Sequence, residues 1–149
     1  MILTQSNSLA ATDITAVIIA KAIAPSGHTI EGEHLDNAYT FDDVTNKELK
    51  MTLQSVLKAG HIPQMKNLSI TLLPNTSSWR FFNDIYQAEE ASNTTIEIQS
   101  LAFTVPSIGV INTFTNGFMV TAKLMPDVKK ILQEGTFKFT FGNFVSVSL

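Results

Sequence analysis

Histidines and acidic residues are the side chains of this sequence with the widest catalytic and metal-binding chemistry. His28 and His34 lie within GHTIEGEH, where Glu31 and Glu33 add two carboxylates, so imidazole and oxygen ligands occur close together. On a single strand the two histidines share one face but lie about 20 Å apart, which is too far for both to bind one metal ion. A shared ion would require the Glu-Gly turn to fold the segment back on itself. The spacing therefore favours the polar tip of a hairpin, and we expect no metal site.

The acidic pair Asp42 and Asp43 is the other candidate for acid–base chemistry. On a strand, adjacent carboxylates point to opposite faces and cannot share a proton or act on one bond, so a turn is the better interpretation. The sequence also lacks cysteine and contains no nucleophile elbow, zinc-protease motif or glycine-rich phosphate loop. An enzyme of unfamiliar type would need a pocket around His28, His34 or Asp84. We therefore predict no catalytic, cofactor-binding or metal-binding residues, and a protein that is not an enzyme.

The composition indicates one domain made mainly of strands. The 149 residues suffice for a single domain, residues 1–149, with a core of its own. Only 15% of the residues are charged and 44% are hydrophobic, and the polar remainder is rich in Thr, Ser and Asn, which favour strands and turns. The net charge of −3 provides no basic surface for phosphates, so sequence-specific binding of nucleic acid is not expected, although DNA could pass by. The low charge also indicates surface that a partner covers.

The first residues of the chain differ in character from the rest. After Met1, Ile2 and Leu3 the sequence up to residue 12 is small and polar, which is typical of a flexible arm (residues 1–12) that becomes ordered on a partner. No basic segment precedes the apolar residues, and Lys21 interrupts the apolar run that follows. We therefore expect neither a secretory signal nor a membrane-spanning helix.

Period-two alternation predicts strands in the first half of the chain, and glycine and proline mark the turns between them. Residues 47–54 and residues 66–73 each place their apolar side chains on one face, as expected of half-buried strands. The full set of expected elements is a buried strand (13–24), a turn at Pro25-Ser26-Gly27, a strand–turn–strand unit (28–40), a turn (41–46), a strand (47–54), a loop (55–64) and a strand (66–73).

The second half is expected to contain one clear helix followed by further strands. Over residues 78–91 the apolar side chains recur at helical spacing, and the hydroxyl residues just before them are good N-caps. Residues 126–135 suit either a short helix or an extended segment. The other expected elements are a strand (94–105), a turn at 106–107, a strand that starts at 118 after Asn116-Gly117, and a last strand (136–141) followed by a bulge at Gly142-Asn143.

Aromatic residues of these elements have two interpretations. Phe137, Phe139 and Phe141 alternate along the last strand and could form a platform for stacking bases, but Lys138 is the only interleaved cation. Trp79 of the expected helix could similarly line a ligand site. In both cases packing in the core of the sheet is the stronger interpretation.

Three stretches occur in an order that resembles the tail tube proteins of contractile-tailed bacteriophages. They are LSITLLPNTSSWRFFNDIY, in which a strand passes through a Ser/Thr turn into an amphipathic helix, then TTIEIQSLAFTVPSIG, and then LMPDVKKILQEGTFKFTFGNF, in which a proline-containing segment precedes an aromatic strand. The resemblance covers roughly residues 38–149. The chain departs from the family pattern in its last strand, where Phe139 and Phe141 stand in place of a frequent Trp.

The resemblance implies an antiparallel β-sandwich or small barrel with one flanking α-helix. Its implied role is that of a structural virion protein: subunits join into hexameric rings, the rings stack into a tube inside a contractile sheath, and DNA is ejected through the lumen. The implied partners are further copies of the chain, the sheath protein, and the baseplate or initiator and terminator proteins, in a phage tail assembled in the bacterial cytoplasm. No cofactor is implied.

The sequence leaves other roles open. A tube protein of a related bacteriocin or secretion machine would share the fold and the ring but not the passage of a genome. A β-sandwich module that binds carbohydrate or protein would be a monomer or small oligomer with exposed aromatic side chains. Within the tube hypothesis, we expect residues 28–57 to reach the next ring, residues 1–12 to fold against a neighbour, and the lumen to be polar with an acidic excess.

Overall fold

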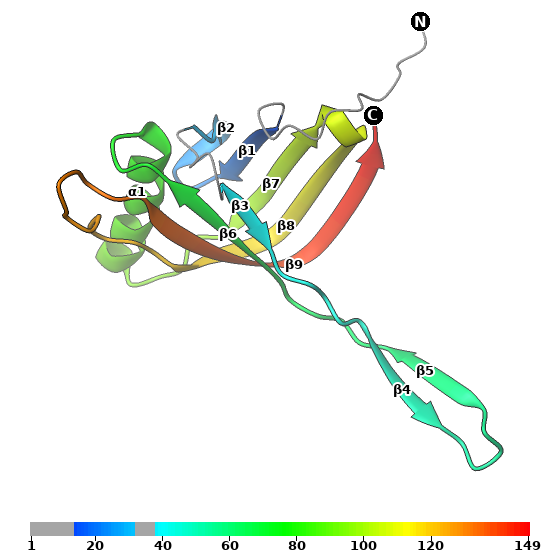
Figure 1. Cartoon of the computed structure of the whole chain (residues 1–149). Helices are drawn as coiled ribbons and strands as arrows, with labels where there is room; N and C mark the ends of the chain where they lie inside the picture. The colour runs from blue at the N-terminus through cyan, green and yellow to red at the C-terminus, as the bar shows by residue number, and fades with distance from the viewer. Residues whose placement is uncertain (1–13, 32–37) are drawn as a thin grey trace, which may run out of the picture.

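The computed structural model describes residues 14–31 and 38–149, and in them the protein is mainly antiparallel β-structure with one helix. The expected arm over residues 1–12 and the candidate ligands His34 and Glu33 lie outside the described residues. The elements, shown in Figure 1, are β1 (Thr15–Ala20), β2 (Ala24–Thr29), β3 (Tyr39–Phe41), β4 (Lys47–Met51), β5 (Leu57–His61), β6 (Lys66–Leu72), α1 (Ser77–Ser92), β7 (Ile98–Val105), a 3-10 turn (Pro106–Ile108), β8 (Val110–Thr121) and β9 (Gly135–Ser148).

One sheet forms the body of the molecule, and it curls on itself. Its seven strands follow the order β2-β1-β7-β8-β9-β6-β3, and every pairing is antiparallel. Although β3 is the far edge of this order, the ring of Tyr39 lies 5.0 Å from that of Phe103 on β7, and the ring of Phe41 lies 5.2 Å from it. Strands four positions apart therefore face each other, as in a sandwich. The predicted mainly β, antiparallel fold with one flanking helix is confirmed.

Helix α1 closes one end of the curled sheet (Figure 1). The helix begins where Thr76 Oγ1 accepts a hydrogen bond from the Trp79 N–H, at 3.4 Å, and it ends at Asn93 in the left-handed conformation. Its apolar face inserts Phe82 between two rings of β9, with ring centroids 5.1 Å from both Phe137 and Phe139. The predicted helix and its hydroxyl N-cap are confirmed.

The core lies on the concave side of the sheet. Phe137, Phe139 and Phe141 are fully buried, so the core interpretation of this alternating triplet is confirmed over the stacking platform. The same alternation buries every second residue of β6, as predicted for residues 66–73. The largest fully buried side chains are Phe82, Phe137, Phe139, Phe141, Ile18, Leu68, Ile70, Leu72, Ile85, Ile98 and Leu101.

The predicted turn at residues 25–27 is wrong, because these residues belong to strand β2. The chain reverses at residues 21–23 instead, where the Ile23 N–H donates to the Ala20 carbonyl at 2.9 Å. Strand β2 is the edge of the sheet, and Pro25 is tolerated there because no neighbouring strand requires its missing N–H.

Two further predictions for β-structure are corrected by strand pairing. Residues 57–61, expected within a loop, form β5, because they pair with β4 along the whole of its length. Asn116-Gly117, expected to precede a strand that starts at residue 118, lies inside the continuous strand β8. A Cβ atom on Gly117 would lie 2.1 Å from Cδ1 of Phe141, so the glycine makes room for a core ring in the neighbouring strand.

The segment between β8 and β9 also differs from its prediction. Residues 126–135 contain no helix: Val128 and Leu132 form an isolated bridge and Gly135 begins β9, closer to the extended alternative. The bulge predicted at Gly142-Asn143 is wrong, since pairing between β8 and β9 is regular there. The register shift lies instead between Met119 and Thr121.

Candidate assembly surfaces

The side chains that were considered for chemistry are engaged in structural contacts or lie far apart. The Nε2 atom of His28 and the backbone N–H of Glu31 both lie within hydrogen-bond distance of Ser78 Oγ, at 3.0 and 2.7 Å. The His28 ring stacks on Phe81 with centroids 4.5 Å apart, and burial lowers the pKa of His28 while the nearby Glu31 opposes that shift. These contacts join β2 to the start of α1.

The described residues do not bring the predicted candidate ligands together. Asp42 lies beyond β3 and Asp84 is exposed on α1, both outside the contacts of His28. Within residues 14–31 and 38–149, no three histidine, aspartate or glutamate side chains are close enough to hold a metal ion. None of the helices in this part of the chain has the length and apolar character needed to cross a membrane.

The most exposed apolar surface is the β4–β5 hairpin, which projects away from the sheet (Figure 1). Pairing of Leu49 with Ala59 and of Met51 with Leu57 places these four residues on one face, which we call the apolar hairpin face. The pair of Lys47 and His61 continues this face at the base of the hairpin. Glu48, Lys50, Lys58 and Gly60 form the opposite, polar face. The hairpin is therefore amphipathic, although no described part of the chain covers its apolar side.

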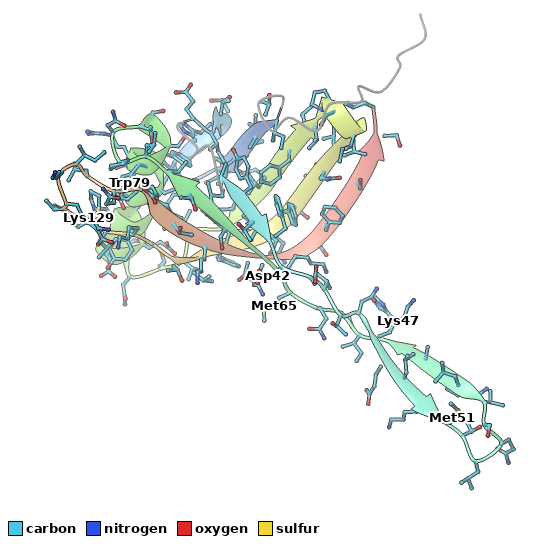
Figure 2. All side chains as sticks on the ribbon, viewed as in Figure 1. Asp42, Lys47, Met51, Met65, Trp79 and Lys129 are labelled. Atoms are coloured by element: carbon cyan, nitrogen blue, oxygen red, sulfur yellow. The ribbon has the colours of Figure 1, made fainter. Side chains whose placement is uncertain are left out.

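This exposure corrects the expected half-buried strand at residues 47–54. All residues of β4 and β5 are exposed, Met51 to 64% of its surface, and Figure 2 shows Met51 far from the body of the molecule. The projecting pair also differs from the expected one, residues 28–57, because its strands are 47–51 and 57–61. A two-stranded hairpin on its own is at most marginally stable in water. The apolar face therefore indicates a docking surface.

The second candidate surface is the open edge of β9. Strand β6 pairs with β9 only as far as Phe141, so among the described residues Gly142–Ser148 pair on one side alone, with β8. The Leu149 N–H points towards β8, where it donates to the Gly109 carbonyl at 2.9 Å. Because backbone groups alternate in direction along a strand, Gly142, Phe144, Ser146 and Ser148 direct theirs outward. The outward Gly142 carbonyl accepts a hydrogen bond from Lys66 Nζ at 3.1 Å.

The third candidate surface is the loop between β8 and β9, beside the N-terminal end of α1. Its exposed apolar side chains include Val128 and Ile131, and Figure 2 shows the neighbouring Lys129 on the outside of the loop. A hollow of about 480 Å³ separates residues 128–132 from the Leu73-Pro74-Asn75 turn. An exposed ion pair between Lys123 and Asp127, at 3.1 Å, holds the start of the loop but contributes little stability.

The fourth surface is a groove at the open end of the curled sheet, away from α1. It has a volume of about 590 Å³ and lies between β3 and strands β7, β8 and β9. Its walls are mostly aromatic: the rings of Phe41 and Phe114 are stacked 5.9 Å apart, and Phe144 lies 4.9 Å from Phe114. We call this site the aromatic groove. Its rings include the exposed Phe41 and Phe144, in contrast to the fully buried Phe137, Phe139 and Phe141.

The fold of this chain is shared with subunits of contractile injection machines. It matches the sheath/tube terminator of the extracellular contractile injection system PVC with a TM-score of 0.65 at 9% identity, covering 97% of this chain and 100% of that chain. It matches the sheath-tube complex of the same system with a TM-score of 0.63 at 8% identity, covering 96% and 93%. For the tube terminating cap of the anti-feeding prophage the TM-score is 0.61 at 9% identity, covering 100% and 97%.

The family of the chain is defined by sequence. Residues 7–145 match the model of the tail fiber protein gp32 family, and the chain belongs to that family. No match was found among curated proteins. The protein is therefore a phage-tail-like structural protein, and the resemblance to phage tail proteins is confirmed at this level.

Sequence reasoning found some of these surfaces and missed others. The alternation of β4 was detected, but its apolar face was assigned to the core because period two alone does not say what covers it. The second strand of the hairpin, LKAGH, has little strand propensity of its own. The open edge and the groove had no local signal, since both depend on where β6 stops pairing with β9 and on how the sheet curls.

Proposed function

We propose that this protein is a tail tube subunit whose copies join into hexameric rings that stack around a lumen for DNA. The whole chain, residues 1–149, acts as one tail-tube-like domain without a catalytic, cofactor or metal site. The observation that carries this proposal is the combination of an open β9 edge and an amphipathic hairpin on one body. The β9 edge and the hairpin are separate surfaces, so a copy that uses one of them can still bind a further copy through the other.

The open edge supports assembly within a ring. Its outward backbone groups at Phe144, Ser146 and Ser148 can pair with an edge strand of a neighbour, which supplies hydrogen bonds and removes an aggregation-prone edge. The opposite edge of the seven-stranded sheet is β2, so one copy can present β2 to the β9 edge of the next. This head-to-tail contact closes into a ring when its rotation fits a whole number of copies.

The hairpin supports contact between rings. It extends away from the sheet, so its apolar face can reach a copy that does not share the β9 edge (Figure 1). The likeness to the sixfold-symmetrised baseplate of the anti-feeding prophage, with a TM-score of 0.58 at 10% identity, is a reason to propose sixfold rings. Sheath, baseplate and terminator proteins are then the proposed partners, in the tail of a virion assembled in the host cytoplasm or in a related injection particle.

A tube terminator is the second candidate, because two of the similar structures are a sheath/tube terminator and a tube terminating cap. A terminator forms one ring at the end of a tube, whereas a tube subunit stacks without limit. The two candidates therefore differ in what the purified protein builds.

Negative-stain electron microscopy with light scattering, over a range of protein concentrations, tests the proposal. Hollow tubes with a regular axial repeat support a tube subunit, and single rings that never stack support a terminator. A protein that stays monomeric at high concentration would contradict both and would favour a binding module.

Two matched pairs of variants test the two surfaces. Met51→Asp on the apolar hairpin face should leave rings that do not stack, while Lys50→Asp on the polar face of the same strand should stack normally. Ser146→Pro removes an outward N–H of β9 and should block ring closure without removing a hydrogen bond to β8. Ser146→Ala should close rings normally. If the Met51→Asp variant still forms tubes, the hairpin is not part of the contact between rings.

A further inference from the structure

The described residues of a single copy leave the aromatic groove unfilled. Its lining combines aromatic rings with the aliphatic side chains of Ile14 and Val105. Its volume of about 590 Å³ is within the range of pockets that bury a drug-sized molecule, which is also the size of a few side chains of a peptide. Exposing this much apolar surface to water costs free energy, so an apolar group that binds in the groove would stabilise the protein.

One buried polar atom in the groove indicates that the occupant should carry a hydrogen-bond donor. The Oδ1 atom of Asn112, on β8, is buried and has no hydrogen-bond partner in the described part of the chain. A buried acceptor without a donor costs roughly 1–3 kcal/mol. An N–H donor on a mainly apolar segment would satisfy this atom, and an extended peptide backbone provides such donors at every second residue on one side.

The chain itself supplies an uncharged segment, with several large apolar side chains, that adjoins the groove. Ile14, the first described residue, lines the groove, and residues 1–13 precede it. Residues 1–12 contain no charged side chain, and their apolar residues include Met1, Ile2, Leu3 and Leu9. Thirteen extended residues reach up to roughly 45 Å, so length does not limit where along the groove they lie. Burying an uncharged segment avoids the cost of desolvating an ion.

We propose that residues 1–12 occupy the aromatic groove of their own chain, with a backbone N–H donated to Asn112 Oδ1. Attachment through Ile14 favours the segment of the same chain over that of another copy, because a short tether gives an effective concentration on the order of millimolar. The proposal does not depend on the role as a tube subunit. A segment from a second copy or a free apolar ligand are the competing occupants.

Disulfide trapping tests this directly, since the chain has no cysteine of its own. Leu3→Cys and Leu9→Cys are each combined with Phe144→Cys at the rim of the groove. In the control, each is combined with Val145→Cys, which is similarly exposed and equally near the tether but lies on the opposite face of β9, outside the groove. The full-length variants are oxidised at micromolar concentration and separated on non-reducing gels, where an intramolecular crosslink runs as a compact monomer.

We expect at least one Phe144→Cys pair to form an intramolecular disulfide about tenfold or more faster than its Val145→Cys control, because both positions lie next to the tether and only Phe144 faces the groove that holds the segment. Equal rates for groove and control pairs would overturn the proposal. A crosslinked dimer as the main product of the groove pairs would also overturn it, and would assign the groove to a second copy.

A fluorescent apolar probe, anilinonaphthalene sulfonate, gives a second measurement that does not require cysteines. The Leu3→Asp, Leu9→Asp double variant should release the segment and raise probe fluorescence several-fold over the unmodified chain. Adding Phe144→Asp should remove that rise, because it places a charge in the groove itself. If the unmodified chain binds the probe as strongly as the double variant does, the groove is empty in solution and the proposal fails.

Discussion

The two ends of the curled sheet are built from the same strands but differ in what covers them. At the helix end, Phe137 and Phe139 of β9 are fully buried beneath Phe82 of α1. Towards the open end the same strand continues as Phe144 and Val147, of which Phe144 is 44% exposed. Strand pattern alone therefore does not set burial. The end that is closed by the helix stabilises the monomer, and the open end keeps its apolar surface for other contacts.

The hairpin extends this contrast beyond the sheet. Strand β6 has one buried face because it lies inside the sheet, whereas β4 has a comparable alternation and no cover. The difference is one of position: the chain leaves the sheet after β3, forms the hairpin outside it, and returns to the sheet at β6 (Figure 1). Apolar surface in this molecule is thus divided between a core that is complete and surfaces that we propose are completed by contacts.

The largest expected effect is a difference in the free energy of unfolding between variants at the two ends of the sheet. Phe82→Ala at the helix end should lower the free energy of unfolding by about 3–5 kcal/mol, because it leaves a cavity between two rings of β9. Phe144→Ala at the open end should cost less, about 1–2 kcal/mol, because the described part of the chain leaves its ring half exposed and only the proposed N-terminal segment would cover it. Denaturant unfolding of the two variants measures the difference. Equal losses would mean that the open end is as well packed in solution as the helix end.

A smaller effect is expected from the glycine that faces the core. Gly117→Ala should destabilise the protein by roughly 1–3 kcal/mol, since its Cβ would overlap the buried ring of Phe141. Gly60→Ala on the hairpin is the matched control, because no atom lies within 4 Å of its Cβ position. We expect a change of no more than about 0.5 kcal/mol for the control. Thermal or denaturant unfolding distinguishes them, and a tolerated Gly117→Ala would show that the Phe141 ring can move.

Loss of the helix cap tests how far α1 depends on its first turn. Thr76→Ala removes the acceptor for the Trp79 N–H and should cost about 1 kcal/mol, while Thr76→Ser should keep most of that stability. Circular dichroism at the helix wavelength during unfolding is the measurement. An unchanged Thr76→Ala variant would mean that packing of Trp79 and Phe82 alone fixes the helix start.

The smallest effect concerns pH at the contact between β2 and α1. Burial lowers the pKa of His28, so the folded state binds fewer protons there than the unfolded state does. The stability is fully present above the ordinary histidine pKa of about 6.5 and is lost as the pH falls from there towards the lowered pKa. The melting temperature should therefore fall as the pH is lowered from 7.5 to 5. The melting temperature of the His28→Gln variant should fall by less over the same range. An identical pH profile for the two proteins would rule out this contribution.

Much of the local structure was predictable because its signals are short in range. The spacing of Trp79, Phe82 and Ile85 and the hydroxyl cap before them predicted α1, and alternation predicted β6 and the buried part of β9. The failures were of another kind. Pro25 and Asn116-Gly117 carry turn signals, yet pairing with neighbours draws both into strands, because an edge tolerates proline and a buried ring requires glycine opposite it.

The sequence by itself determined which faces are apolar, where the helix begins, and that no cysteine chemistry is present, since each depends on residue type and spacing within a few positions. Only the tertiary structure decided which apolar faces are covered. The outward groups of β9 are open because β6 ends its pairing at Phe141, and the aromatic groove exists because the curl of the sheet brings β3 opposite β7. Both depend on contacts between residues far apart in the chain, and no local pattern encodes them.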